Sequence, residues 1–217
     1  MVCLQKNYKI TIVSFEKIKN HLQNKDVILN KLEKNNVEWI PLKYTKRPPI
    51  FSTIWDIYKL RKAINKLKNK GLHLIHCRSY ITTLVALGFK KKYKTPFIFD
   101  MRGFYTDERV DGKIWTLDNF IYKKIYNYFK FKEREFLQYT DYTISLTKNG
   151  KKEILSCNLP NQSKIKVIPC CTDENLFLEK NIQNVISELG FNKEDFIISY
   201  FGSIGTWYML DEMLDIF

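Results

Sequence analysis

Residues 96–115, PFIFDMRGFYTDERVDGKIW, begin with a short apolar run and continue at once into a charged segment. The run Pro96–Phe99 is too short for a helix, and it is typical of a buried strand. Asp100 and Arg102 follow it directly, and Gly103 permits a sharp turn and the close approach of a ligand. The pattern therefore predicts a strand whose end carries polar groups suited to a site.

Similar apolar runs recur along the chain. Segments with a period near 3.6 residues separate them, and this alternation is typical of a parallel α/β sheet with helices on both faces. We therefore expect an α/β fold with a Rossmann-like parallel sheet. The predicted strands are 10–14, 37–40, 72–77, 96–99, 142–146, 165–168 and 196–201.

Three segments carry an apolar stripe at helical spacing. We interpret these stripes, aromatic residues included, as faces buried in the core rather than as a surface for stacking nucleic-acid bases. The stripes consist of Ile54, Ile57, Tyr58, Ile64 and Leu67; of Tyr80, Leu84, Leu87 and Gly88; and of Phe120, Ile121, Ile125, Tyr128 and Phe129.

Length and charge limit the class of protein. The chain has 217 residues, of which 45% are hydrophobic, so it can bury a core, and we expect one full domain and part of another. Its 36 Lys and Arg residues against 23 Asp and Glu residues give a net charge of +13. Such a charge attracts nucleic acid, nucleotides and anionic membrane surfaces alike. The lysines are spread along the chain, so charge alone selects none of these partners.

Cysteine usage and hydropathy indicate a cytoplasmic protein. The five cysteines form no C-x-x-C pair and no metal-ligand spacing with the three histidines, so we expect no metal and a reducing compartment. No apolar run approaches the roughly 20 residues of a membrane span. The N-terminus lacks the apolar core of a signal peptide. Peripheral contact with the inner face of a membrane remains compatible with the basic charge.

A domain boundary is expected between residues 170 and 195. The run KIKVIP ends at Pro169, a connecting segment follows, and DFIISYFGSIG then combines an apolar run with a Gly-containing turn. A strand followed by such a turn is how a Rossmann-like domain begins. We therefore assign residues 1–172 to one domain, and residues 173–217 to the connection and the start of a second.

Ligands of open parallel sheets bind beyond the carboxyl ends of the strands. Arg78, with His76 beside it, could grip a carboxylate or a phosphate. The alternative is that Ser79 caps the next helix and His76 is structural. Asp100 could act as a base or bind a sugar hydroxyl, while Arg102 could neutralise a phosphate.

Two further features have structural alternatives. An ion-paired surface loop is the alternative for the charged stretch, and we favour it for Arg109 and Asp111. The turn GSIGTWY, residues 202–208, offers free backbone N–H groups that could hold a diphosphate. It matches neither the dinucleotide-binding nor the P-loop pattern, so it is a weak indication by itself.

Several motifs together resemble glycosyltransferase family 4, the nucleotide-sugar-dependent enzymes of GT-B architecture. The most specific are a glutamate eight residues before an aspartate, Glu133 and Asp141, and the segment VIPCCTDENLF, which resembles the family's junction between two Rossmann-like domains. The order and spacing are also matched by HLIHCRSY, PFIFDMRGFYTDERVDGKIW, EREFLQYTDYTISLT and SYFGSIGTWYML.

The resemblance implies transfer of a sugar from a nucleotide-diphosphate donor to an acceptor hydroxyl, without a metal or a bound cofactor. The charged stretch would then be the acceptor-side lip of the cleft between the domains, and Glu133 and Asp141 would be structural. The roles implied are catalysis for Asp100 and Arg102; acceptor binding for His76, Arg78, Asp107 and Glu108; and donor binding for Gly202, Ser203, Gly205 and Tyr208.

The sequence departs from the family pattern at both ends. The family has a strand, a Gly-rich loop and a helix before the strand that YKITIVSFEK resembles, whereas eight residues precede Lys9. That first strand is central in the order 3-2-1-4-5-6, so we expect a gap in the sheet. The family's donor half, with its E-x7-E pair, does not appear before Phe217. We expect little activity from the chain alone, and a separate donor-domain polypeptide as a partner.

Two other classes of function remain open at this stage. The chain could be a binding module that holds a glycan, a lipid-linked saccharide or another anionic ligand without chemistry. It could also be a nonspecific nucleic-acid binder, which only the +13 charge and dispersed aromatic residues support. We expect no specific nucleic-acid partner.

Overall fold

Strands and helices alternate along the chain in the computed structural model, which describes residues 7–48, 50–160, 162–172, 188–192, 194–200, 202 and 210–216. The elements, in chain order, are β1 (Ile10–Glu16), α1 (Ile18–Glu33), β2 (Val37–Lys43), α2 (Phe51–Lys68), β3 (Ile75–Arg78), α3 (Tyr80–Tyr93), β4 (Phe97–Asp100), α4 (Tyr105–Asp111), α5 (Phe120–Tyr139), β5 (Tyr142–Ser145), α6 (Lys148–Ser156), β6 (Lys164–Val167) and α8 (Leu210–Leu214).

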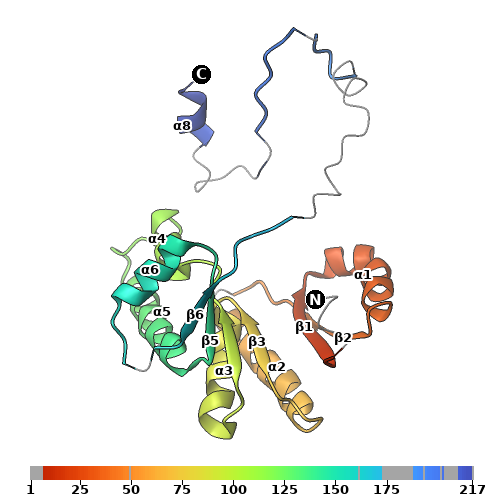
Figure 1. The fold of residues 1–217 in the computed structure, drawn as a ribbon, viewed down its shortest axis with the longest axis vertical. Coiled ribbons are helices and arrows are strands. Elements are labelled where there is room, and N and C mark those ends of the chain that lie inside the picture. Colours follow the sequence, from red (N-terminus) through yellow and green to blue (C-terminus); the bar gives the residue numbers. More distant parts are fainter. Residues whose placement is uncertain are drawn as a thin grey trace.

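The strands form two parallel sheets (Figure 1). One sheet pairs β1 with β2, from Ile10 opposite Val37 to Glu16 opposite Lys43. The other has the order β3-β4-β5-β6, and all of its neighbours are parallel. The predicted α/β class is confirmed, and so are the predicted strands up to residue 168, with small shifts at their ends.

A gap separates the two sheets. Among the described residues, no strand pairs with the free edge of β1 or with that of β3. Helix α2 bridges the two parts, because Leu60 and Ile64 share an apolar cluster with Val13 of β1 and with Phe89 of α3. The predicted gap in the sheet is thus confirmed, and side-chain packing rather than a hydrogen-bonded ladder joins its two sides.

The main core lies between the four-stranded sheet and the helices α3 and α5. Tyr80, Phe97, Phe99 and Phe136 are fully buried there. Tyr80 contacts Phe99 edge-on at 5.5 Å between ring centroids, and Phe99 contacts Phe136 at 5.4 Å. Such pairs add to the free energy that burial contributes. This core fixes the ends of β3 and β4, where the predicted site lies.

The predicted apolar stripes are only partly buried. Helices α2, α3 and α5 occur where they were expected, but Ile54 and Tyr58 of α2 are exposed. The buried face of α2 consists of Ser52, Asp56, Leu60, Ala63, Ile64 and Leu67. The stripe prediction was wrong for Ile54 and Tyr58 because α2 carries apolar residues on two sides, whereas Ile64 and Leu67 of the stripe are buried as expected.

The third stripe needs the same correction. Phe120, Ile121 and Tyr128 of α5 are exposed, whereas Phe129 is buried and Ile125 packs at the edge of the core. Helix α3 contacts both α2 and α5, so the three helices form one layer in which α3 is the middle member (Figure 1). The two outer helices therefore have the most surface free to face away from the core.

The strand predicted at residues 196–201 does not form in its described part. Residues 196–200 have no strand pairing, and Phe196 is 91% exposed. A strand is stabilised by a neighbouring strand, and none of the described residues pairs with this segment.

No described helix is long and apolar enough to cross a membrane.

Candidate functional site

The carboxyl ends of β3 and β4 lie side by side and bring four predicted residues together. Arg78 is the register partner of Asp100, and the backbone N–H of Ser79 donates to the Asp100 carbonyl at 2.8 Å. His76 Nε2 lies 3.7 Å from Asp100 Oδ2. Arg102 follows two residues later. The parallel pairing thus gathers an imidazole, a carboxylate and two guanidinium groups at adjacent strand ends.

Asp100 has an incompletely satisfied carboxylate. Its side chain is 15% exposed, and its Oδ1 atom is buried with no hydrogen-bond partner among the described residues. A buried acceptor without a partner costs about 1–3 kcal/mol. Native structures rarely retain such a group without a reason, and a ligand hydroxyl would satisfy it. This observation supports a binding role for Asp100.

The backbone is strained at both strand ends. Ser79 has φ 70° and ψ 178°. Arg102 has φ 64°. Residues other than glycine seldom adopt such positive values of φ, which cost about 1–3 kcal/mol each and gather at functional sites. The alternative in which Ser79 caps the next helix is wrong, because its side chain makes no cap hydrogen bond to α3, and its carbonyl instead accepts from the Thr83 hydroxyl at 2.7 Å.

A cavity of about 560 Å³ adjoins the end of β4. Arg102, Asp107 and Glu108 line one side, whereas His76, Arg78 and Asp100 are not among its lining residues. The predicted residues therefore divide into a strand-end group and a cavity group, and Arg102 of the cavity group lies two residues after the strand-end Asp100. We call the two together the strand-end site.

The other wall of the cavity comes from the end of β5 and the start of α6, which sequence reasoning missed. Ser145, Thr147 and Gly150 lie there. Thr147 caps α6, because its Oγ1 accepts from the Gly150 N–H at 2.9 Å. A Cβ atom on Gly150 would come 2.8 Å from Ser145 Oγ. The run YTISLTKNG, a strand followed by a threonine cap, is the signal that could have found this wall.

The later part of the charged stretch is a short helix rather than a loop, whereas residues 101–104 form neither helix nor strand. Residues 105–111 form α4, and Asp107 and Glu108 lie in its first turn, where the helix dipole favours negative charge. Glu108 folds back over Gly103, since a Cβ at that position would lie 1.9 Å from Glu108 Oε1. Arg102 Nη2 is 3.6 Å from the sulfur of Cys170, at the start of the connecting segment.

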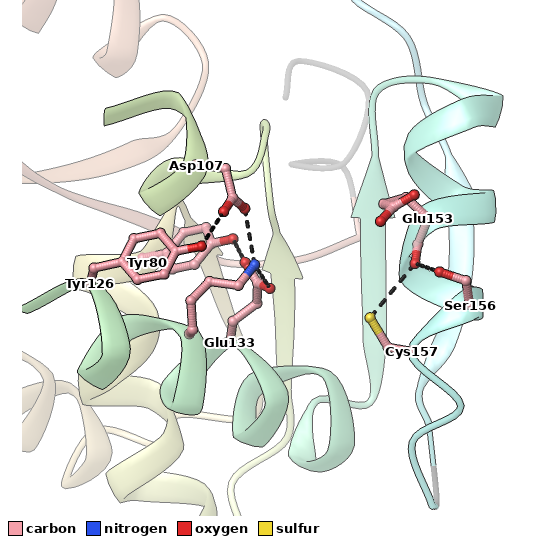
Figure 2. Close-up of polar contacts among 8 residues, drawn as sticks. Tyr80, Asp107, Tyr126, Glu133, Glu153, Ser156 and Cys157 are labelled. Carbon is pink, nitrogen blue, oxygen red and sulfur yellow. Dashed lines mark hydrogen bonds and ion pairs between the residues drawn. The ribbon is translucent and has the colours of Figure 1, made fainter. Parts of the chain in front are cut away.

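Asp107 belongs to a polar network that also includes Glu133 (Figure 2). Lys130 Nζ lies 2.9 Å from Asp107 Oδ2 and 2.9 Å from Glu133 Oε1. Tyr126 donates to Asp107 at 2.8 Å, and Tyr80 donates to Glu133. Asp107 is thus held by one cation and one hydroxyl of α5, those of Lys130 and Tyr126. It can shape the cavity, but part of its charge is already neutralised.

The pKa shifts in this network follow from burial and pairing. Desolvation raises the pKa of Tyr80, and the Glu133 carboxylate raises it further. Burial lowers the pKa of Lys130, but its hydrogen bonds to Glu133 and Asp107 outweigh that effect and leave the pKa raised. Tyr80 therefore stays neutral and Lys130 stays charged at ordinary pH. The network keeps the same hydrogen bonds over this range and holds α3, α4 and α5 together.

Glu133 and Asp141 have the structural roles that were expected. Glu133 is buried and joins α5 to Tyr80 of α3. Asp141 accepts from Lys90 at 2.6 Å and from the backbone N–H of Phe97 at 2.9 Å, so it ties the start of β5 to α3 and β4. Both carboxylates fix elements of the fold, and Glu133 is also among the residues that line the cavity.

The donor-side prediction lies mostly outside the described residues. Gly202 is described, whereas Ser203, Gly205 and Tyr208 are not. The predicted diphosphate site therefore stays a prediction. Within the described ranges, no group of three or more His, Cys, Asp or Glu side chains is placed to hold a metal ion.

Parallel sheets with a site beyond the carboxyl ends of the strands define a Rossmann-like α/β protein. The model of Glycosyltransferase Family 4 matches residues 3–176, which is most of the chain, and the chain belongs to that family. A comparison with curated protein sequences found no significant match.

A solved structure shows the same fold. Sucrose-phosphate synthase from Thermosynechococcus elongatus aligns with a TM-score of 0.57 at 14% sequence identity. The alignment covers 86% of this chain and 54% of that one, so the chain spans about half the length of this relative. At this identity, the likeness concerns the fold alone.

Proposed function

We propose that the chain serves in the transfer of a sugar from a nucleotide-diphosphate sugar to an acceptor hydroxyl, in the synthesis of a cell-surface or other glycan. Its described domain holds the acceptor at the strand-end site. Membership of Glycosyltransferase Family 4 supports the class of reaction. The observation that carries the proposal is the under-satisfied Asp100 carboxylate, two residues before the strained Arg102, which lines the cavity.

The chemistry requires a group that orients the acceptor hydroxyl and a cation that balances phosphate charge. Asp100 Oδ1 is buried and has no partner among the described residues. A carboxylate oxygen accepts hydrogen bonds from hydroxyls, so the Asp100 side chain would have to turn towards the acceptor to receive one. Arg102 offers a planar fork of donors suited to a phosphate or a carboxylate. Electrostatic stabilisation of the leaving diphosphate is usually the largest catalytic contribution, and the donor domain would supply most of it. A separate polypeptide is our candidate for that domain.

Sugar transfer tests the proposal directly. The full chain is incubated with UDP- and GDP-hexoses and with saccharide or lipid-linked saccharide acceptors, alone and with a separately expressed donor domain of a family 4 enzyme. Mass spectrometry then detects an acceptor that has gained one hexose. We expect product only in the complemented mixture, and we expect it to be lost with Arg102→Ala. Arg134→Ala, which removes an exposed arginine on α5, is the matched control and should leave turnover unchanged.

The alternative is a binding module that holds a glycan without chemistry. Acceptor binding that depends on Arg102, with no hexose transferred under any of these conditions, would favour the module. Absence of both binding and transfer would contradict both candidates.

A further inference from the structure

The outer face of α2 exposes a group of large apolar side chains. Phe51 is 71% exposed, Ile54 58%, Trp55 54% and Tyr58 54%. Trp55 and Tyr58 stack on each other at 5.3 Å between ring centroids. These four residues fall on the side of α2 opposite to its buried face, and neither apolar cluster of the fold contains them. We call them the α2 patch.

The same face of α2 continues as a cationic strip. Arg61, Lys62 and Lys66 follow the α2 patch on its exposed side, at helical spacing. Among the described residues, no carboxylate lies within 4 Å of any of them. Asp56, the one acid in α2, is buried and is bound by Lys59 at 2.7 Å. The free face of α2 thus combines aromatic residues with cations and carries no negative charge.

We propose that this face of α2 docks on an anionic membrane surface. Aromatic side chains favour the boundary between the headgroups and the hydrocarbon, and lysine and arginine pair with anionic headgroups around them. The net charge of +13 acts in the same direction. A helix of a folded domain that presents apolar residues and cations together matches this partner in both respects.

The position of α2 relates this docking to the site. Helix α2 begins after the end of β2 and finishes before the start of β3, so its N-terminal half, which carries the α2 patch, lies towards the carboxyl ends of the strands (Figure 1). The strand-end site lies at the same edge. Docking through the α2 patch would bring an acceptor carried by a lipid near Asp100 and Arg102, a consequence that rests on the proposed function.

Helix α5 offers a matched comparison. It also exposes aromatic residues, Phe120 and Phe131 among them, but three of its four lysines, Lys124, Lys130 and Lys132, have partners. Lys124 lies over the Phe120 ring at 4.3 Å, and Lys132 pairs with Glu135 at 2.5 Å. Pairing within the helix leaves less positive charge free for lipid. We therefore expect α2, and not α5, to carry the docking.

Vesicle co-sedimentation of the full chain tests the proposal. The vesicles are of phosphatidylcholine alone, or of equal parts phosphatidylcholine and phosphatidylglycerol. We expect binding to the anionic vesicles that weakens with salt, and little binding to the neutral ones. Phe51→Ser with Trp55→Ser should weaken the binding by roughly tenfold or more. Lys62→Glu with Lys66→Glu should weaken it about fivefold or more for each charge. Phe120→Ser with Phe131→Ser on α5 should leave it unchanged.

Two further measurements distinguish loss of membrane binding from misfolding of a variant and from binding of a different partner to the α2 patch. Trp55→Phe preserves an apolar side chain, so binding should persist while brominated lipid quenches less tryptophan emission than in the wild type. Equal losses in the α2 and α5 variants would overturn the proposal, as would no binding to anionic vesicles. A wild-type dimer that the α2 variants dissociate, without vesicle binding, would overturn it and assign the patch to a second copy of the chain. Vesicle binding requires no sugar transfer, so it can succeed or fail independently of the proposed function.

Discussion

Arg102 combines a strained backbone conformation with a side chain that we propose to act in the site. Its φ of 64° lies in the left-handed region. A side chain in that region costs about 1–2 kcal/mol relative to glycine. The fold retains an arginine there, in the lining of a cavity and two residues after Asp100, and the strain is offset by packing elsewhere. A conformation of this kind points to a role for the guanidinium rather than to an accident of the turn.

Two substitutions separate strain from function at this position. We expect Arg102→Gly to unfold at the wild-type temperature or above it, and Arg102→Ala to be about 1 kcal/mol less stable than the glycine variant, because only glycine adopts this φ freely. Both should lose acceptor binding to a similar degree. Thermal unfolding and saccharide titration of the two variants provide the check. Acceptor binding that survives in Arg102→Gly would remove the side chain from the site.

Cys77 should be the least reactive of the described cysteines. Burial raises the pKa of its thiol to about 12, while Cys157, Cys170 and Cys171 are exposed. Because the thiolate is the reactive form, brief alkylation at about pH 8 should modify Cys157 and spare Cys77 until denaturant is added. Peptide mapping by mass spectrometry reads both sites. Equal labelling in the native protein would show that β3 is open to solvent.

The same pKa shift makes stability depend on pH. The folded pKa of Cys77 lies above its ordinary value of 9.0, so the unfolded thiol ionises first. The stability that this group contributes is therefore complete below about pH 9 and declines as the pH rises towards 12. Lysine and tyrosine residues titrate in the same range, so a comparison with Cys77→Ala is needed to isolate this group's share.

At the scale of elements, α5 is fastened to α3 and α4 by one carboxylate and one lysine. Glu133 accepts from Tyr80, and Lys130 bridges Glu133 and Asp107 (Figure 2). Glu133 is buried, so removing it leaves a tyrosine hydroxyl and part of a lysine charge without their partner. Breaking a buried pair by deleting one member costs about 3–5 kcal/mol.

We expect Glu133→Ala to lose about 3 kcal/mol of unfolding free energy and Glu133→Gln to lose less, since the amide oxygen can still accept from Tyr80. Urea unfolding followed by circular dichroism measures both. At temperatures where the glutamine variant is folded, its acceptor affinity should equal that of the wild type. A glutamine variant of normal stability that no longer binds acceptor would give Glu133 a direct role in the site.

The elements also show what sequence patterns can and cannot predict. Short apolar runs located the strands well, because strands buried between helices need continuous apolar residues. The apolar stripe on α2 predicted the wrong buried face for Ile54, which is exposed whereas Leu60 is buried. Both residues follow the helical period, so only packing against neighbouring elements decides which side of the helix is covered. The strand ends at Asp100 and Arg102 were located from order along the chain. The cavity wall at Thr147 was not located from the sequence, because the pairing of β4 with β5 is what brings Thr147 to the cavity beside the end of β4.

At the scale of the whole molecule, the described fold is divided between β1 and β3, where no strand pairing joins the two sheets. A two-stranded parallel sheet is marginal by itself, and here it depends on α2 for its contact with the rest. No residue of β1 is fully buried, whereas Phe97 and Phe99 of β4 are. The two parts of the domain should therefore open with different free energies.

Native hydrogen exchange can measure that difference. We expect amides of β1 and β2 to exchange at least roughly tenfold faster than those of β4 and β5, because local opening of the small sheet exposes little core. Leu60→Ala should widen the difference, since it weakens the cluster that holds the small sheet. Exchange followed by mass spectrometry resolves the two regions. Equal protection in all four strands would mean that the sheets unfold as one unit.

The central claim is that the ends of β3 and β4 hold an acceptor saccharide. The most direct test is a titration of the ¹⁵N-labelled full chain with a panel of saccharides, followed by amide chemical shifts. The account predicts shifts concentrated at Arg78, Asp100, Arg102 and Glu108 that disappear in Arg102→Ala and persist in Arg134→Ala. Shifts that lie elsewhere, or that Arg102→Ala leaves unchanged, would contradict it.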